Sequence, residues 1–190
     1  MNAYQLLLFV HVVAAVGMFA AIAAEAVALA IVQRADSSEQ AHLGIGLIAL
    51  PLRLGLVALG PALGTGLGMM FMTWGHRPWM AVAFWGMVAM AILGVWVSGR
   101  RLRRLREALA SDPGPRLSAA VRSLRSSNAL AASVWLRVAI GVAILALMVL
   151  KPEIAGSAVI LATGALGGLL AGRASLAAWR SRAMAAPGAP

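Results

Sequence analysis

Five long stretches without a charged residue constrain this chain more than any other feature. They are 4–24, 54–75, 78–98, 138–150 and 154–172. Runs of about 18 or more apolar residues are typical of transmembrane helices. The chain is 62% apolar and only 12% charged, whereas soluble domains are roughly 45–50% apolar. A soluble domain of 190 residues could not cover that much apolar surface. The sequence therefore predicts an all-α, polytopic membrane protein.

These stretches place five transmembrane spans within a single domain, 1–183, followed by a disordered tail, 184–190. The expected spans are 4–32, 46–72, 79–99, 129–150 and 154–172. The first two are longer than a bilayer core of about 30 Å requires, so their helices are expected to tilt or protrude. The first span lacks the positively charged start of a signal peptide, which predicts a retained helix and leaves a cleaved signal as the alternative.

The segment between the third and fourth spans, 100–128, is expected to form a helical hairpin. Leu102, Leu105 and Leu109 recur at helical spacing, and the Pro-Gly-Pro sequence at 113–115 interrupts the pattern. The many arginines of this segment are interpreted as a solvated topology signal. Binding of anionic lipids is the alternative.

The distribution of basic residues predicts the orientation of the helices. The chain carries 16 Lys and Arg against six Asp and Glu, a net charge of +10. With five spans, twelve basic residues fall on one face of the membrane and only Arg77 and Lys151 on the other. The positive-inside rule then places the N-terminus outside and the C-terminus in the cytoplasm. A four-span arrangement would divide the basic segments between the two faces.

Composition also excludes several kinds of chemistry. The absence of Cys excludes disulfides, iron–sulfur clusters and thiol catalysis. Because the basic residues flank hydrophobic spans, they indicate membrane topology rather than binding to nucleic acid. The sequence contains no HExxH motif, no paired carboxylates and no phosphate loop, so hydrolase or transferase chemistry has no support. The abundance of Arg and Ala is typical of GC-rich bacterial genomes, which predicts a bacterial plasma membrane.

Four ionisable residues lie within the predicted spans, where polar groups are costly and mark candidate functional sites. His11 is the first candidate, because a neutral imidazole binds heme iron or copper. A hydrogen bond to a neighbouring helix is the alternative. Glu25 is expected to pair with either Arg53 or Arg137, since all three lie in the inner half of the membrane. The remaining arginine would bind an anionic group such as a propionate or extend to the interface.

The segment 68–80, GMMFMTWGHRPWM, is a candidate copper site. Thioether and imidazole groups are ligands of copper(I). The candidate metal ligands are His11, Met69, Met72 and His76. The alternative is an ordinary turn at the membrane surface, because Trp74 and Trp79 are typical interfacial anchors and Pro78 suits the first turn of a helix.

Two series of glycines recur every four residues in the second and fifth spans. They are Gly60, Gly64 and Gly68, and Gly164, Gly168 and Gly172. Small residues at this spacing let helix backbones approach closely. They predict packing within the bundle, or an interface with another membrane subunit or a second copy of the chain.

Three short motifs within 4–153 resemble a known superfamily. They are LLLFVHVVAAVGMFAA with His11, LPLRLGLVALGPALGTGLGM with Arg53, and RVAIGVAILALMVLKPE, where a span ends in Lys-Pro. The chain resembles small bacterial membrane proteins that include CopD-like copper-resistance proteins, a predicted-membrane-protein branch of unknown function, and HemJ-type protoporphyrinogen oxidases. The branch of unknown function is the nearest. The resemblance implies a four-helix core with an added fifth helix and, from the HemJ type, heme b ligation by His11.

Three functional hypotheses follow. The first is an accessory subunit of a larger membrane complex, respiratory or photosynthetic. The second is a heme b-binding redox protein with His11 as axial ligand, and the third is copper handling at the outer face. The third span lacks the Lys and the Tyr-His pair of HemJ-type proteins, so enzymatic activity is not the first expectation. An enzyme would be a HemJ-like, heme-dependent oxidoreductase.

Overall fold

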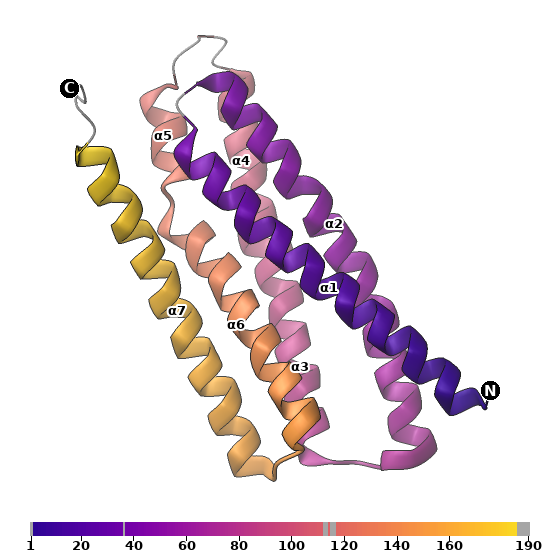
Figure 1. Ribbon diagram of the computed structural model, residues 1–190. Coiled ribbons are helices and arrows are strands. Elements are labelled where there is room, and N and C mark those ends of the chain that lie inside the picture. Colours follow the sequence, from indigo (N-terminus) through magenta and orange to yellow (C-terminus); the bar gives the residue numbers. More distant parts are fainter. Residues whose placement is uncertain (1, 36, 112–113, 115–116, 186–190) are drawn as a thin grey trace.

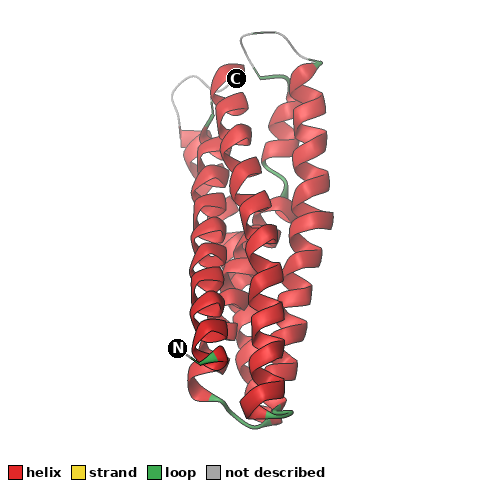
Figure 2. Ribbon diagram, turned by 90° about the vertical axis from the view of Figure 1, so that its right-hand side faces the viewer, coloured by secondary structure: helices red, strands yellow, loops and turns green. Residues whose placement is uncertain are grey.

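The computed structural model describes residues 2–35, 37–111, 114 and 117–185. Within these ranges the secondary structure is helical, without a strand. Five helices are long and apolar enough to cross a membrane. They run side by side along an elongated bundle (Figures 1 and 2). The expected all-α, multi-pass membrane bundle is therefore confirmed.

The helices reach beyond the expected spans at several ends. In chain order they are α1 (Ala3–Arg34), α2 (Ser38–Met69), the π-helix η1 (Met70–Trp74), α3 (Pro78–Ile92), the π-helix η2 (Leu93–Ser98), α4 (Gly99–Ala110), α5 (Ala119–Arg125), α6 (Asn128–Leu150) and α7 (Ile154–Ala185). Both α1 and α2 contain 32 residues, about 48 Å at 1.5 Å per residue. The predicted tail begins inside α7, and its residues 186–190 lie outside the described chain.

The bundle has two chemically different ends. The end that holds the N-terminus, η1 and the turns after η1 and α6 is called the cavity end, and the opposite end, with α4 and α5, the arginine end (Figures 1 and 2). At the arginine end, Leu102, Leu105 and Leu109 of α4 are buried against α1 and α2. The helix that the leucine spacing predicts is therefore confirmed. The α4 helix directly continues α3, because η2 joins the two without an intervening loop.

Four helices form the central core, and α7 packs on its outside against α6 and α3 (Figure 1). The core joins Met18 of α1, Ala62 of α2, Met87 of α3 and Leu147 of α6. Large apolar side chains on the outer faces remain 63–71% exposed, among them Phe9, Val57 and Val149. Lipid tails are as apolar as these side chains, so this pattern suits a bundle whose surroundings are a bilayer.

The two glycine series differ in what they contact. A Cβ atom at Gly168 would lie 2.8 Å from the Leu136 Cα atom, and one at Gly164 would lie 2.9 Å from the Ala143 Cβ atom. The backbones of α6 and α7 therefore approach closely, as the fifth-span series predicts. At Gly60 and Gly64 no such neighbour lies within 4 Å in the described chain. Packing of this second-span face against another subunit stays a prediction.

Candidate functional site

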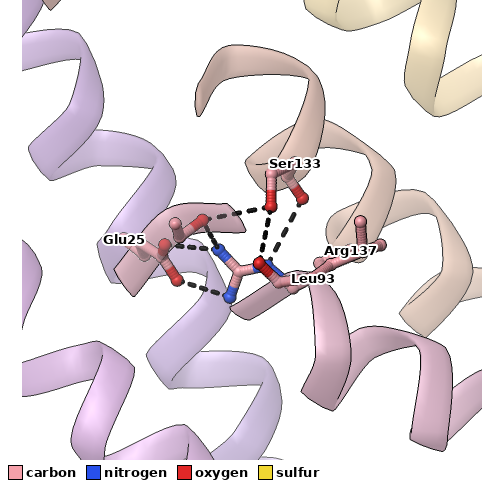
Figure 3. Close-up of polar contacts among 5 residues, drawn as sticks. Glu25, Leu93, Ser133 and Arg137 are labelled. Atoms are coloured by element: carbon pink, nitrogen blue, oxygen red, sulfur yellow. Dashed lines mark hydrogen bonds and ion pairs between the residues drawn. The ribbon is translucent and has the colours of Figure 1, made fainter. Parts of the chain in front are cut away.

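Glu25 of α1 and Arg137 of α6 form an ion pair inside the bundle (Figure 3). Arg137 Nη1 donates to Glu25 Oε2 at 2.7 Å, and Nη2 donates to Glu25 Oε1. The Arg137 side chain is 5% exposed and the Glu25 side chain 1%. A buried charge is costly unless it is paired and hydrogen-bonded. The structure thus confirms that Glu25 reaches an intramembrane arginine and selects Arg137.

Two buried serines complete the hydrogen bonding of this pair. Arg137 Nη2 also donates to Ser98 Oγ at 3.0 Å, and Nε donates to the Ser133 carbonyl at 3.3 Å. Ser133 Oγ donates to the Leu93 carbonyl at 3.1 Å, so Ser98 is the donor in its 3.1 Å contact with Ser133 Oγ (Figure 3). Leu93 and Ser98 are the two ends of η2. The chain of donors therefore ends on a backbone carbonyl of the π-helix.

The serines were not among the predicted site residues. Serine hydroxyls are common within apolar helices. These two acquire a role only because the folded helices turn them toward Arg137. The ion pair adjoins a small cavity of about 30 Å³, which Met18, Pro51 and Met90 also line. That volume has room for about one or two water molecules. A ligand larger than water does not fit beside the pair.

Arg53 takes no part in this network. It lies on the exposed side of α2 and forms no ion pair with any residue in the described ranges. Its neighbours Pro51 and Leu52 line the small cavity beside Glu25, so Arg53 lies at a similar height in the bundle. The structure therefore separates the two intramembrane arginines into one buried and paired residue and one that faces outward.

His11 lies on α1, closer to the cavity end than Glu25. Its Nδ1 atom is 3.0 Å from the Ala62 carbonyl and 3.2 Å from Thr65 Oγ1. Because a carbonyl oxygen can only accept, Nδ1 carries a proton, and in the neutral form of the ring Nε2 keeps its lone pair. The expected hydrogen bond to a neighbouring helix is present, and it leaves Nε2 without a partner among the described residues.

The glycine next to Thr65 makes this arrangement of His11 possible. A Cβ atom at Gly66 would lie 3.3 Å from His11 Cε1 and 3.6 Å from Nδ1. The Thr65 hydroxyl donates to the Pro61 carbonyl at 2.5 Å, which leaves its oxygen free to accept from the imidazole. The α2 backbone and one hydroxyl thus fix which nitrogen of His11 is protonated.

A cavity of about 700 Å³ opens beside His11 at the cavity end. Its wall combines aromatic and sulfur-containing side chains with two cations. The wall includes Tyr4, His11, Met69, Trp74, Arg77 and Lys151. Small-molecule sites are typically concave, mostly apolar and roughly 300–1,000 Å³ in volume. This cavity meets that description, and the small cavity beside Arg137 does not.

The structure brings together some of the predicted metal ligands. His11, Met69 and His76 line the large cavity, whereas Met72 is 53% exposed and lies outside its wall. The helix continues through η1 as a π-helix and ends at Gly75, whose φ is 63°. Within the described residues no three His, Cys, Asp or Glu side chains form a metal-binding group.

No protein-family model, curated protein or solved structure significantly matches this chain. The resemblance to CopD-like and HemJ-type proteins stays a prediction. The chain is thus a multi-pass membrane protein with five membrane-spanning helices. It contains a buried ion pair whose bonds are satisfied internally, and a separate open cavity.

Proposed function

We propose that this protein binds heme b in the large cavity, with His11 Nε2 as an axial ligand. The observation that carries the proposal is the state of His11, whose Nδ1 is held by the Ala62 carbonyl at the wall of a cavity of about 700 Å³. Histidines that ligate metals commonly donate the other ring N–H to a carbonyl or carboxylate, which fixes the tautomer and raises the basicity of the ligating nitrogen.

The donor set fits this group. A proximal His is a common heme ligand, and Met or a second His serves as the other axial ligand in many heme proteins. Met69 and His76 line the same cavity and are the candidates for that second position. Trp79 and Phe84 add apolar and aromatic surface to the wall, as a largely apolar macrocycle requires.

When bound, heme supplies one-electron redox chemistry. The residues of the chain would hold and tune it. The Ala62 carbonyl orients the imidazole, and the apolar wall limits access of water, which influences redox potential. With the N-terminus outside, as the positive-inside rule predicts, the cavity opens toward the outer face of the membrane. A heme in this position would exchange electrons on that side.

The test is an absorption spectrum of the protein purified in mild detergent and reconstituted with heme b. We expect a Soret band, and we expect His11→Ala to abolish it or change it to a weakly bound form. His42→Ala is the matched control, because His42 is exposed on α2 at the arginine end. A wild-type Soret band in His11→Ala would contradict the proposal. Metal analysis of the protein as purified, before reconstitution, would favour copper handling instead if it found stoichiometric copper and no heme.

A second candidate function is an accessory subunit of a larger membrane complex. The outward-facing Arg53 favours it, because a lipid-exposed arginine within a long apolar helix is costly without an anionic partner. Gly60 and Gly64 lie on the same helix with open space beside them. We expect Arg53→Leu to shift the size of the assembly in gently solubilised native membranes. An unchanged size would count against this role, and Arg34→Leu, at the end of α1, is the control.

A further inference from the structure

The two charged residues in the wall of the large cavity are both cations. They are Arg77, in the turn between η1 and α3, and Lys151, in the turn between α6 and α7. No Asp or Glu lines the cavity in the described part of the chain. Both turns lie at the cavity end, whereas His11 is seven residues further along α1 than the wall residue Tyr4, a rise of about 10 Å. The cavity therefore has cations toward its mouth and an imidazole deeper inside.

Trp74, the last residue of η1, positions both cations. The Lys151 Nζ atom lies 4.3 Å from the centroid of the Trp74 ring. Arg77 Nε donates to the Trp74 carbonyl at 3.3 Å, which leaves the two Nη groups free of described hydrogen bonds. The Trp74 ring is itself fixed, because its Nε1 donates to Tyr4 Oη at 3.2 Å and the ring forms a T-shaped pair with Trp79, with ring centroids 6.3 Å apart.

The backbone at Lys151 does not explain why a lysine stands there. Lys151 caps α6 in the left-handed conformation, with φ 49° and ψ 49°. It is the one residue other than glycine with a positive φ in the described ranges. Glycine adopts this conformation with less strain and is the usual residue after a helix. The contact of the lysine side chain with Trp74 at the cavity mouth is therefore the reason we give for a lysine at this position.

We infer that the cavity takes an amphipathic carboxylate, whose acidic groups bind Arg77 and Lys151 at the mouth while its apolar body fills the interior. The inference deepens the proposed function, since the two propionates of heme b are such groups, and it rests on that proposal for the identity of the ligand. A guanidinium binds a carboxylate through two parallel hydrogen bonds. The Lys151 ammonium is already held over the Trp74 ring. It can therefore bind the second carboxylate without a further loss of side-chain entropy.

The experiment separates carboxylate recognition from iron ligation by using porphyrins without iron. Protoporphyrin IX and its dimethyl ester are titrated into the detergent-solubilised protein, with quenching of tryptophan fluorescence as the readout. The variants are Arg77→Met, Lys151→Met and the double variant. Lys151→Arg keeps the charge, and Lys151→Gly removes the charge while relaxing the backbone. Arg104→Met is the matched control, because Arg104 is an exposed arginine at the opposite end.

We expect each single variant to weaken binding of protoporphyrin IX about tenfold, the effect of losing one charge-assisted contact. Lys151→Gly should match Lys151→Met, and Lys151→Arg should retain most of the affinity. The dimethyl ester should bind the wild type about as weakly as the free acid binds the double variant. Arg104→Met should leave both affinities unchanged.

Equal affinity of the ester and the acid, or wild-type affinity in the double variant, would overturn the inference. Its failure is distinguishable from failure of the proposed function. If His11→Ala abolishes the heme Soret band but the cations do not matter, the heme proposal stands alone. If the cations matter and the heme spectrum is insensitive to His11, the carboxylate site stands alone. If neither iron-free porphyrin binds and heme b gives no Soret band, both are wrong.

Discussion

The Glu25–Arg137 network and the His11 cavity both place polar side chains within apolar helices, but they differ in what remains unused. The ion pair is neutral, its serine contacts end on the Leu93 carbonyl, and the space beside it holds little more than water. His11 uses one ring nitrogen and adjoins a cavity more than twenty times larger, about 700 Å³ against 30 Å³. A polar residue whose bonds are all satisfied internally has no group left for a ligand, whereas one with a free lone pair beside a cavity is available to a ligand.

The largest effect is expected from breaking the closed network. Arg137→Met should lower the free energy of unfolding by about 3–5 kcal/mol, because it leaves the Glu25 carboxylate buried and unpaired. The measurement is thermal and denaturant unfolding in mild detergent. The double variant Glu25→Leu with Arg137→Met removes both charges and should regain most of that stability. Equal stability of the single and double variants would contradict a charge-based role for the pair.

The same comparison between closed and open regions applies to the glycines, with a smaller effect. Gly168→Ala should destabilise the protein by about 1–3 kcal/mol through overpacking, since the added Cβ would meet the α6 backbone at 2.8 Å. Gly64→Ala should be neutral or slightly stabilising for the isolated chain, because the position is open and Ala favours a helix. Unfolding measurements on the two variants test this. Similar losses in both would show that α2 and α7 are packed alike.

Among the destabilising substitutions, the smallest loss of stability is expected at the open site. His11→Ala removes a part-buried hydrogen bond to the Ala62 carbonyl and should cost about 1 kcal/mol. It should nevertheless remove the heme spectrum, so stability and ligand binding should separate at this residue. The same purified variant supplies both measurements. A loss of stability as large as that of Arg137→Met, with any bound ligand unaffected, would make His11 part of the scaffold, like the ion pair, and not a ligand-binding residue.

Several elements of the fold were predictable because their cause is local. The α1 and α6 helices closely match the expected spans, since the extent of each apolar stretch is read directly from the sequence. Pro78 begins α3 as predicted, because its missing N–H costs nothing in the first turn. The two π-helices were not predicted. They lack a sequence signal of their own, and their hydrogen-bond register depends on neighbouring helices, as the Ser133 contact to Leu93 shows.

The candidate site was predictable in part. His11 and Glu25 stood out because ionisable residues are rare in apolar spans. Spacing alone left two arginines available to Glu25 and grouped Met72 with Met69. The structure pairs Arg137 with Glu25 and turns Met72 outward, where it is 53% exposed. Trp74 was expected only as an interfacial anchor, and its contacts with Tyr4 and Lys151 join segments that lie far apart in the chain.

The sequence by itself determined that this chain is a bundle of membrane-spanning helices with costly polar groups at known positions along each span. Position along a helix follows from counting residues, at 1.5 Å for each. Only the tertiary structure decided which arginine is neutralised, which nitrogen of His11 stays free and where a cavity opens. Those outcomes depend on how each helix is rotated about its axis and how closely its neighbours approach, which the sequence of one helix does not specify.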